Sequence, residues 1–548
     1  MSLPPQPSYV VPDETARVAR AAFPRGNPYL DMADALGPLY TSPQFAALYP
    51  RDGQPALDPA RLALVTIFQF VEGLSDRQAA DAVRGRIDWT YALCLPLDAA
   101  GFDYSVLTEF RSRLLAGGAA LLLFETLLEH LKAHQLVKPR SRQRTDSTHV
   151  LAAIQMLSRL EMIGETLRQA LDILARVAPA WLRAWVPGAW FDRYGQRFAD
   201  YRLPTGRAER TALAEEIGTD GHRLLTAVYA ADAPAWLREV PVVQTLRCVW
   251  LQQFYAEDPL RLRLAADLPP APMLINSPYD PDARWSKKRE VVWTGYKVHL
   301  TETCEAELPN VITDVATTAA TTTDNMVTTA IEDRLAGRGL VPREHLVDTS
   351  YVSAAHLVTS RTRHECDLVG PIHKDYSWQA RAGQGFGMAA FTIDWSAQQA
   401  TCPQGKTSAV WKPTHDADGH PVINIRFASA DCRACAVRAQ CVASKRERSL
   451  NIRHREEYEA LQAARHRQTT PDFREQYARR AGVEGTISQG VHVGDLRRSR
   501  YRGLAKTTLN HVLIATALNY RRVAAWLAEA PRARTRHPAF AALATSNV

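Results

Sequence analysis

The chain has 548 residues, of which 46% are hydrophobic and 23% are charged. This composition is ordinary for folded globular protein and excludes a disordered chain, and the length allows roughly three or four domains. The formal net charge of +8 favours an acidic partner such as nucleic acid. Because no run of 18 apolar residues and no signal-peptide pattern occurs, we expect a cytoplasmic, nucleoid-associated protein that does not enter membranes.

The first 138 residues are predicted to be an arm and a helical domain. Residues 1–46 are rich in proline with little periodicity and are predicted to form a loosely packed N-terminal arm. Residues 47–138 carry helical patterns, and Arg111 and Arg113 are expected to face outward from one helix. Short helices with outward arginines fit a DNA-binding module of the helix-turn-helix type, and a plain helical bundle is the alternative.

Residues 139–155 form the first convincing strand, and a carboxylate, Asp146, stands in it. Leucines and isoleucines then recur every three or four residues, which predicts a helical insertion over about 156–280. Residues 291–302 and 310–318 alternate between apolar and polar side chains and predict two strands joined by a turn.

The following segment alternates between helices and strands. Helical patterns at 322–340 and 353–365 separate apolar strands at 343–352 and 366–372. Crossovers of this length imply parallel pairing. Asp348 stands at the carboxyl end of its strand, where open α/β sheets gather catalytic groups.

Four of the eight cysteines are close together in a β-rich insertion predicted at about 376–450. They are Cys402, Cys432, Cys435 and Cys441. In a reducing compartment such a cluster more often binds metal than forms disulfides. One CxxC pair with two further cysteines predicts a structural zinc site, and free thiols are the alternative.

Three carboxylates stand out by position: Asp146, Asp348 and Glu484, which lies on a predicted late helix. Without the two insertions, the elements follow the order of the ribonuclease H-like fold, whose first and fourth strands are neighbours beside the final helix. Three acidic groups there can hold two Mg²⁺ (or Mn²⁺) ions, since hard cations prefer oxygen ligands. Two such ions support in-line phosphoryl displacement.

The motifs "RTDSTHVLAAI", "WTGYKVHLTETC", "EHLVDTSYV" and "YARRAGVEGTISQGV" occur in this order, and "FDYSVLTEFRSRL" precedes them. Together they resemble the DDE transposases of bacterial insertion sequences, most closely the IS-eleven-eighty-two-like branch of the IS-four superfamily. The resemblance covers most of residues 50–525. It implies a ribonuclease H-like DDE catalytic domain over 139–520, followed by a helix end and tail at 521–548.

The resemblance assigns the acidic triad to Asp146, Asp348 and Glu484. The superfamily signature Y-x2-R-x3-E-x6-K then places Tyr477 and Arg480 before Glu484, and the spacing puts all three on one helix face. An arginine one turn from the glutamate would hold a phosphate. The final signature lysine is absent because Val491 stands there. The candidates to replace it are Lys506, Arg497 and Arg498.

Other carboxylates are weaker candidates for the triad. A strand aspartate is more often a hydrogen-bonded structural group, and Asp314 on a neighbouring strand is expected to be structural. Glu456, Glu457 and Glu475 lack the tyrosine and arginine spacing.

A basic run follows the predicted catalytic helix. It consists of Arg497, Arg498, Arg500, Arg502 and Lys506, with Tyr501 among them. Clustered guanidiniums bind phosphates, and an interleaved aromatic ring can stack on a base. The run predicts DNA contact, and a solvated charged loop is the alternative.

The sequence therefore predicts an insertion-sequence transposase. It would bind double-stranded DNA at terminal inverted repeats, cleave it with bound metal and join the freed 3′-hydroxyl to target DNA, as a homodimer. Three alternatives remain: a ribonuclease H-like nuclease without strand transfer, a catalytically inactive transposase-derived DNA-binding protein, and a zinc-dependent regulator.

Overall fold

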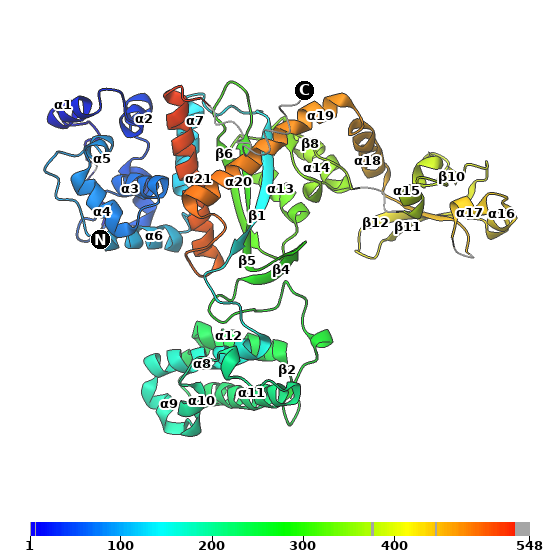
Figure 1. Cartoon of the computed structure of the whole chain (residues 1–548), viewed down its shortest axis with the longest axis horizontal. Helices are drawn as coiled ribbons and strands as arrows, with labels where there is room; N and C mark the ends of the chain where they lie inside the picture. The colour runs from blue at the N-terminus through cyan, green and yellow to red at the C-terminus, as the bar shows by residue number, and fades with distance from the viewer. Residues whose placement is uncertain (1, 6, 374–376, 444–445, 532–548) are drawn as a thin grey trace, which may run out of the picture.

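The computed structural model describes residues 2–5, 7–373, 377–443 and 446–531. One mixed sheet occupies the centre, with helices on both sides and two lobes extending from it (Figure 1). Within the described residues, no helix combines the length and the apolar character needed to cross a bilayer.

Six strands build the central sheet. They are β1 (Gln143–Leu151), β4 (Arg284–Lys288), β5 (Val291–Thr303), β6 (Ile312–Ala319), β7 (Glu344–Leu346) and β8 (Asp367–Val369). The path runs β4-β5-β1-β7-β8, and β6 also pairs with β5. β5 is antiparallel to β1, β4 and β6, whereas β7 is parallel to both β1 and β8. β1 and β7 are thus neighbours, and their carboxyl ends lie at the same edge.

The N-terminal helices pack together and against α21 (Leu504–Leu527), which in turn packs on the central sheet. They are α1 (Asp13–Ala22), α2 (Pro28–Leu36), η1 (Ser42–Leu48), α3 (Pro59–Glu72), α4 (Asp76–Gly85), α5 (Ile87–Ala92), α6 (Ser105–Ala116) and α7 (Leu122–Ala133). The prediction of a loosely packed arm is wrong for α2 and η1, since Met32 and Phe45 are buried in the main core, and for α1, since Ala19 is buried in a smaller core with Leu30 and Tyr91. Pro28 does not break the chain's regular structure. It occupies the first turn of α2, where Asn27 caps the helix.

The helical lobe has its own core, separate from that of the sheet. It contains α8 (Arg159–Val177), α9 (Pro179–Trp185), α10 (Ala189–Tyr194), η2 (Asp200–Arg202), α11 (Arg207–Tyr229), η3 (Ala235–Glu239), α12 (Pro241–Gln253), β2 (Phe254–Tyr255), β3 (Arg261–Leu262) and η4 (Ala265–Asp267). This helical lobe lies below the sheet in Figure 1.

The second lobe, here called the cysteine-rich lobe, spans 377–452 and also has its own core. It contains α15 (Trp378–Ala382), η7 (Met388–Ala390), β9 (Thr392–Asp394), β10 (Gln399–Thr401), β11 (Ser408–His415), β12 (Pro421–Phe427), α16 (Ser429–Ala434), α17 (Arg438–Cys441) and β13 (Ser449–Ile452). It extends to the right in Figure 1 and is joined to the rest by α18 (Arg455–Arg467).

The remaining elements surround the sheet. They are η5 (Asp324–Val327), α13 (Thr328–Gly337), η6 (Thr349–Tyr351), α14 (Ala354–His364), α19 (Pro471–Ala478), η8 (Arg479–Ala481), α20 (Gly482–Gly494) and α21 (Leu504–Leu527). α20 contacts β1 and β5, and α21 packs between β6 and α3. Of the predicted tail, residues 532–548 lie outside the described residues.

Candidate active site

Asp146 and Asp348 lie at one edge of the sheet. Asp146 is the fourth residue of β1, and Asp348 follows the end of β7. Asp348 caps η6, and its carboxylate accepts the Ser350 N–H at 2.8 Å. The parallel pairing of β1 with β7 is what brings these two carboxylates to the same edge.

Glu484 reaches this edge from the first turn of α20, and Arg480 lies between the strand and the helix. One guanidinium nitrogen of Arg480 is 2.6 Å from Oδ2 of Asp146, and another is 2.9 Å from Oε1 of Glu484. A single cation therefore bridges two carboxylates that are far apart in the sequence.

Electrostatics ties all three carboxylates to one site. Burial raises the pKa of Asp146, the charge of Arg480 lowers that pKa, and the charge of Asp348 raises it. Burial likewise raises the pKa of Tyr477, and the negative charges of Asp348, Asp146 and Glu484 act in the same direction. Tyr477 thus lies within electrostatic reach of the whole set.

The donor set at this edge contains only carboxylate oxygens, which suits a hard divalent cation such as Mg²⁺. Among the described residues, ligand atoms lie within 4.8 Å of one another in two other groups: Glu332, His345 and Cys366, and a second group in the β11–β12 turn. The three edge carboxylates are more widely spaced, because the Arg480 guanidinium lies among them. Metal binding would therefore require Arg480 to release Asp146 and Glu484.

A buried ion-pair network explains why α20 lies against this edge. Glu302 on β5 is fully buried and pairs with Arg144 of β1 at 2.7 Å and with Arg522 of α21 at 2.7 Å. Its carboxylate also accepts the Thr486 hydroxyl of α20 at 2.6 Å. The network fastens two helices to the two central strands.

Gly482 marks the closest approach of helix and strand. Arg144 donates to the Arg479 carbonyl at 2.6 Å, just before α20 begins. A Cβ on Gly482 would lie 2.0 Å from the Arg144 guanidinium. Glycine at 482 therefore allows Arg144 to hold the segment that carries Arg480.

The predicted single helix through Tyr477, Arg480 and Glu484 is wrong in detail. Tyr477 belongs to α19, Arg480 to the 3-10 turn η8, and Glu484 to α20. The backbone stays helical through the junctions, so Arg480 still reaches Glu484 one turn later. Val491, at the position of the missing lysine, packs against the main core.

The basic run places one arginine beside Asp146. The Leu151 N–H donates to the Arg497 carbonyl, and Ser499 N–H donates to the Leu151 carbonyl, both at 2.8 Å. The run thus extends the edge of β1. Arg497 Nε donates to Thr148 Oγ1 at 2.8 Å, two residues from Asp146 and on the same strand face.

The other basic residues of the run are exposed: Arg498, Arg500, Arg502 and Lys506. None of the four forms an ion pair with a residue in the described part of the chain. Arg502 lies over the Tyr279 ring, 5.4 Å from its centroid. Arg500 and Lys506 instead line a pocket of about 320 Å³ against the N-terminal helices.

Comparison with protein families matches two parts of the chain. Residues 401–524 match the transposase DDE domain, and residues 17–113 match the transposase domain DUF772. The two matches support a transposase. The first includes Glu484 but neither Asp146 nor Asp348. Searches of curated proteins and of solved structures found no match.

The four predicted zinc ligands lie together in the cysteine-rich lobe. Cys402, Cys432, Cys435 and Cys441 line one pocket of about 330 Å³. Burial raises the pKa of Cys441, and the other three cysteines act in the same direction. Their sulfurs are not in either group with ligand atoms within 4.8 Å, and Cys432 Sγ accepts the Arg448 N–H at 3.5 Å. The donor set suits zinc, but side chains would have to turn inward to bind it.

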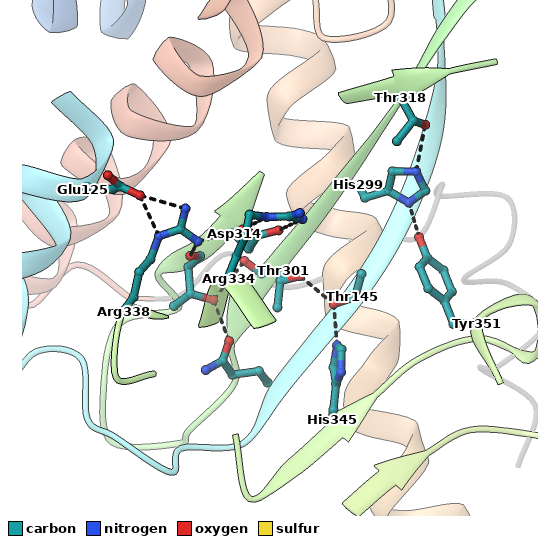
Figure 2. Close-up of polar contacts among 12 residues, drawn as sticks. Glu125, Thr145, His299, Thr301, Asp314, Thr318, Arg334, Arg338, His345 and Tyr351 are labelled. Carbon is teal, nitrogen blue, oxygen red and sulfur yellow. Dashed lines mark hydrogen bonds and ion pairs between the residues drawn. The ribbon is translucent and has the colours of Figure 1, made fainter. Parts of the chain in front are cut away.

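Two sequence expectations about charged residues have clear outcomes. Asp314 is structural: it is fully buried and ion-paired with Arg334 and Arg338 (Figure 2). The outward orientation of Arg111 is wrong, because its buried guanidinium pairs with Asp76 at 2.6 Å, and Arg113 lies over the Tyr49 ring.

A further polar group, not predicted from the sequence, lies beside Asp146. Asp324 at the start of η5 is buried, accepts the Ser147 hydroxyl at 3.2 Å and faces Lys297 and Lys288. No motif in the sequence marks Asp324, because its partners Ser147 and Lys297 lie 177 and 27 residues away.

Proposed function

We propose that the protein is a DDE transposase whose ribonuclease H-like core cleaves and joins DNA at Asp146, Asp348 and Glu484. The observation that carries the proposal is that Arg480 bridges Asp146 and Glu484 where β7 ends beside β1, and that the charge of Asp348 acts on the same arginine. The strand order, with antiparallel β6, β5 and β1 followed by parallel β7 and β8, supports the assignment of the core.

Asp146, Asp348 and Glu484 would hold two Mg²⁺ or Mn²⁺ ions. Bound there, the ions would activate the attacking oxygen and neutralise charge on the phosphate and the leaving oxygen. The strands fix the two aspartates, and the Glu302 network fixes the helix that presents Glu484.

The cations at the edge would bind the phosphate that is cut. Once released from the carboxylates, Arg480 can donate two parallel hydrogen bonds to a phosphate. Arg497, held by Thr148, can approach the same phosphate from the other side, and it is the best placed of the three candidates to replace the lysine absent at Val491. Tyr477 would close the site beside Arg480.

The N-terminal helices would recognise the element's ends. α3 and α4 are joined by three residues beginning with Gly73, whose φ of 69° reverses the chain, as in helix-turn-helix modules. The exposed basic residues from Arg498 to Lys506 would follow the backbone of the same double-stranded DNA. Two copies of the chain would pair two ends as a homodimer.

The cysteine cluster would bind one structural zinc ion. Four thiolates form a closed tetrahedral site, so this ion would stabilise the cysteine-rich lobe and take no part in catalysis. Elemental analysis of purified protein should find about one zinc per chain. Its absence would remove this part of the proposal and leave the DDE site untouched.

The proposal is tested with a labelled DNA fragment that carries the element's own ends, incubated with Mg²⁺. Wild type should cut at the ends and join them to target DNA, whereas Asp146→Ala and Glu484→Gln should do neither. Cutting without joining would identify a nuclease. Equal products from wild type and both variants would contradict a catalytic role for these residues.

A further inference from the structure

A second cleft, of about 660 Å³, opens beside the carboxylate edge. It is bounded by β4, β5 and η5 on one side and by α18 and the base of the cysteine-rich lobe on the other. Ser350, whose N–H binds Asp348, also lines it. The cleft is therefore next to the proposed active site but does not contain it.

The charged lining of this cleft is strongly positive. It includes five lysines or arginines and one carboxylate, Asp324: the cations are Lys287, Lys288, Lys297, Arg453 and Arg465. Lys287 and Arg465, from opposite walls, form no ion pair with any residue that the structure describes. Two walls thus present unneutralised charge to the same space.

Asp324 organises one wall. Its carboxylate has 4% of its side-chain surface exposed and lies 3.4 Å from Lys297 Nζ and 3.6 Å from Lys288 Nζ. It also binds the hydroxyl of Ser147, the residue after Asp146. A buried carboxylate is stable only when it is paired, so Asp324 and the two lysines hold one another in place next to β1.

We infer that this cleft binds the phosphodiester backbone of the DNA strand that flanks the scissile bond. The inference rests on the proposed function, and it extends that function to residues that no motif marks. Lys287 and Lys288 on one wall and Arg465 on the other would each contact a phosphate. The cysteine-rich lobe would then act as the outer wall that keeps DNA against the carboxylate edge.

The test measures binding of duplex DNA carrying the element's end, without divalent metal, at several salt concentrations. Each lost phosphate contact lowers the slope of log Kobs against log salt by about one unit, so Lys287→Ala/Lys288→Ala should lower it by about two. Arg465→Gln should lower it by about one. The matched control, Lys138→Ala/Arg223→Ala, removes two exposed charges outside the cleft and should leave the slope unchanged.

The outcomes separate this inference from the proposed function. If both cleft variants keep the wild-type slope while wild type still binds and cuts DNA, the cleft inference is overturned and the transposase proposal stands. If wild type does not bind end DNA at all, both are overturned. Lys287 and Lys288 are exposed on β4, and Arg465 tests the opposite wall should the double variant misfold.

Discussion

Two clusters of a carboxylate with arginines lie on the same sheet, and they differ in how many hydrogen bonds the arginines donate to each carboxylate. Asp314 on β6 is fully buried, and Arg334 of α13 and Arg338, the residue after α13, donate three hydrogen bonds to its carboxylate at 2.7–2.9 Å. Asp146 on β1 keeps 15% of its side-chain surface exposed and has one arginine, Arg480, which it shares with Glu484. The first cluster has no capacity for a ligand, whereas the second can exchange its arginine for one.

Figure 2 shows the hydrogen bonds and ion pairs of the first cluster. Arg338 also reaches Glu125 on α7, which ties the N-terminal unit to α13. Nearby, Thr145 joins Thr301 and His345 across three strands. Residue type alone therefore does not distinguish Asp146 from Asp314; their exposure and the number of arginines bound to each carboxylate do.

The largest expected effect on DNA cleavage comes from removing the charge of Asp146, in the cluster of Asp146, Arg480 and Glu484, here called the open cluster. Asp146→Asn should lower the rate of DNA cleavage about a thousandfold or more, since a lost metal ligand removes several kcal/mol of transition-state stabilisation. Stability should change by only about 1 kcal/mol, because Arg480 keeps Glu484 as a partner. Cleavage rate and thermal unfolding of the same preparation measure both. An unfolded variant would mean that Asp146 is structural, like Asp314.

Asp314→Asn should show the opposite pattern. It leaves two arginines facing a neutral group in the core, which should cost about 3–5 kcal/mol in the free energy of unfolding. Chemical denaturation measures the loss, and cleavage per folded molecule should remain near the wild-type value. A thousandfold loss of cleavage at full stability would erase the distinction between the clusters.

Gly482→Ala tests how the open cluster is held. The added methyl group would displace the Arg144 guanidinium, and such crowding costs about 1–3 kcal/mol. Because Arg144 positions the segment with Arg480, cleavage should fall roughly tenfold. Gly485→Ala is the matched control, as a Cβ there meets no atom within 4 Å. Equal cleavage by the two variants would show that the Arg144 contact does not position the site.

Buried His511 on α21 should make the stability of the fold depend on pH. Burial lowers the pKa of His511 on α21 to about 3, so this histidine stays neutral beside Thr317 of β6 while the unfolded chain is protonated below about pH 6.5. Stability should therefore fall as pH falls, by about 1 kcal/mol from pH 6.5 to 5.5 through this group. Denaturation across this range should show a shallower slope for His511→Gln, and an unchanged slope would contradict the assignment.

The sequence predicted the strands and the candidate carboxylates because both have local signals. Alternation marks β5 and β6, and Asp348 ends an apolar strand. The sequence could not predict how many arginines bind each carboxylate. Asp146 and Asp314 both stand in strands, and only the packing of α13 and the residue after it brings Arg334 and Arg338 to Asp314. The partners of Glu302 lie 158 and 220 residues away. The packed N-terminal helices could not be predicted, because a proline that begins a helix cannot be told from one that breaks a helix by sequence alone.

The most direct test of the open cluster is calorimetric titration of Mn²⁺ into the protein bound to pre-cut end DNA that lacks the 3′-hydroxyl, since this DNA can be neither cut nor joined and the heat reports metal binding alone. Wild type and Asp314→Asn should bind about two ions per chain at this edge, and Asp348→Asn should lose them. Mn²⁺ binding that is the same in wild type and Asp348→Asn would contradict the claim that Asp146, Asp348 and Glu484 form the metal site.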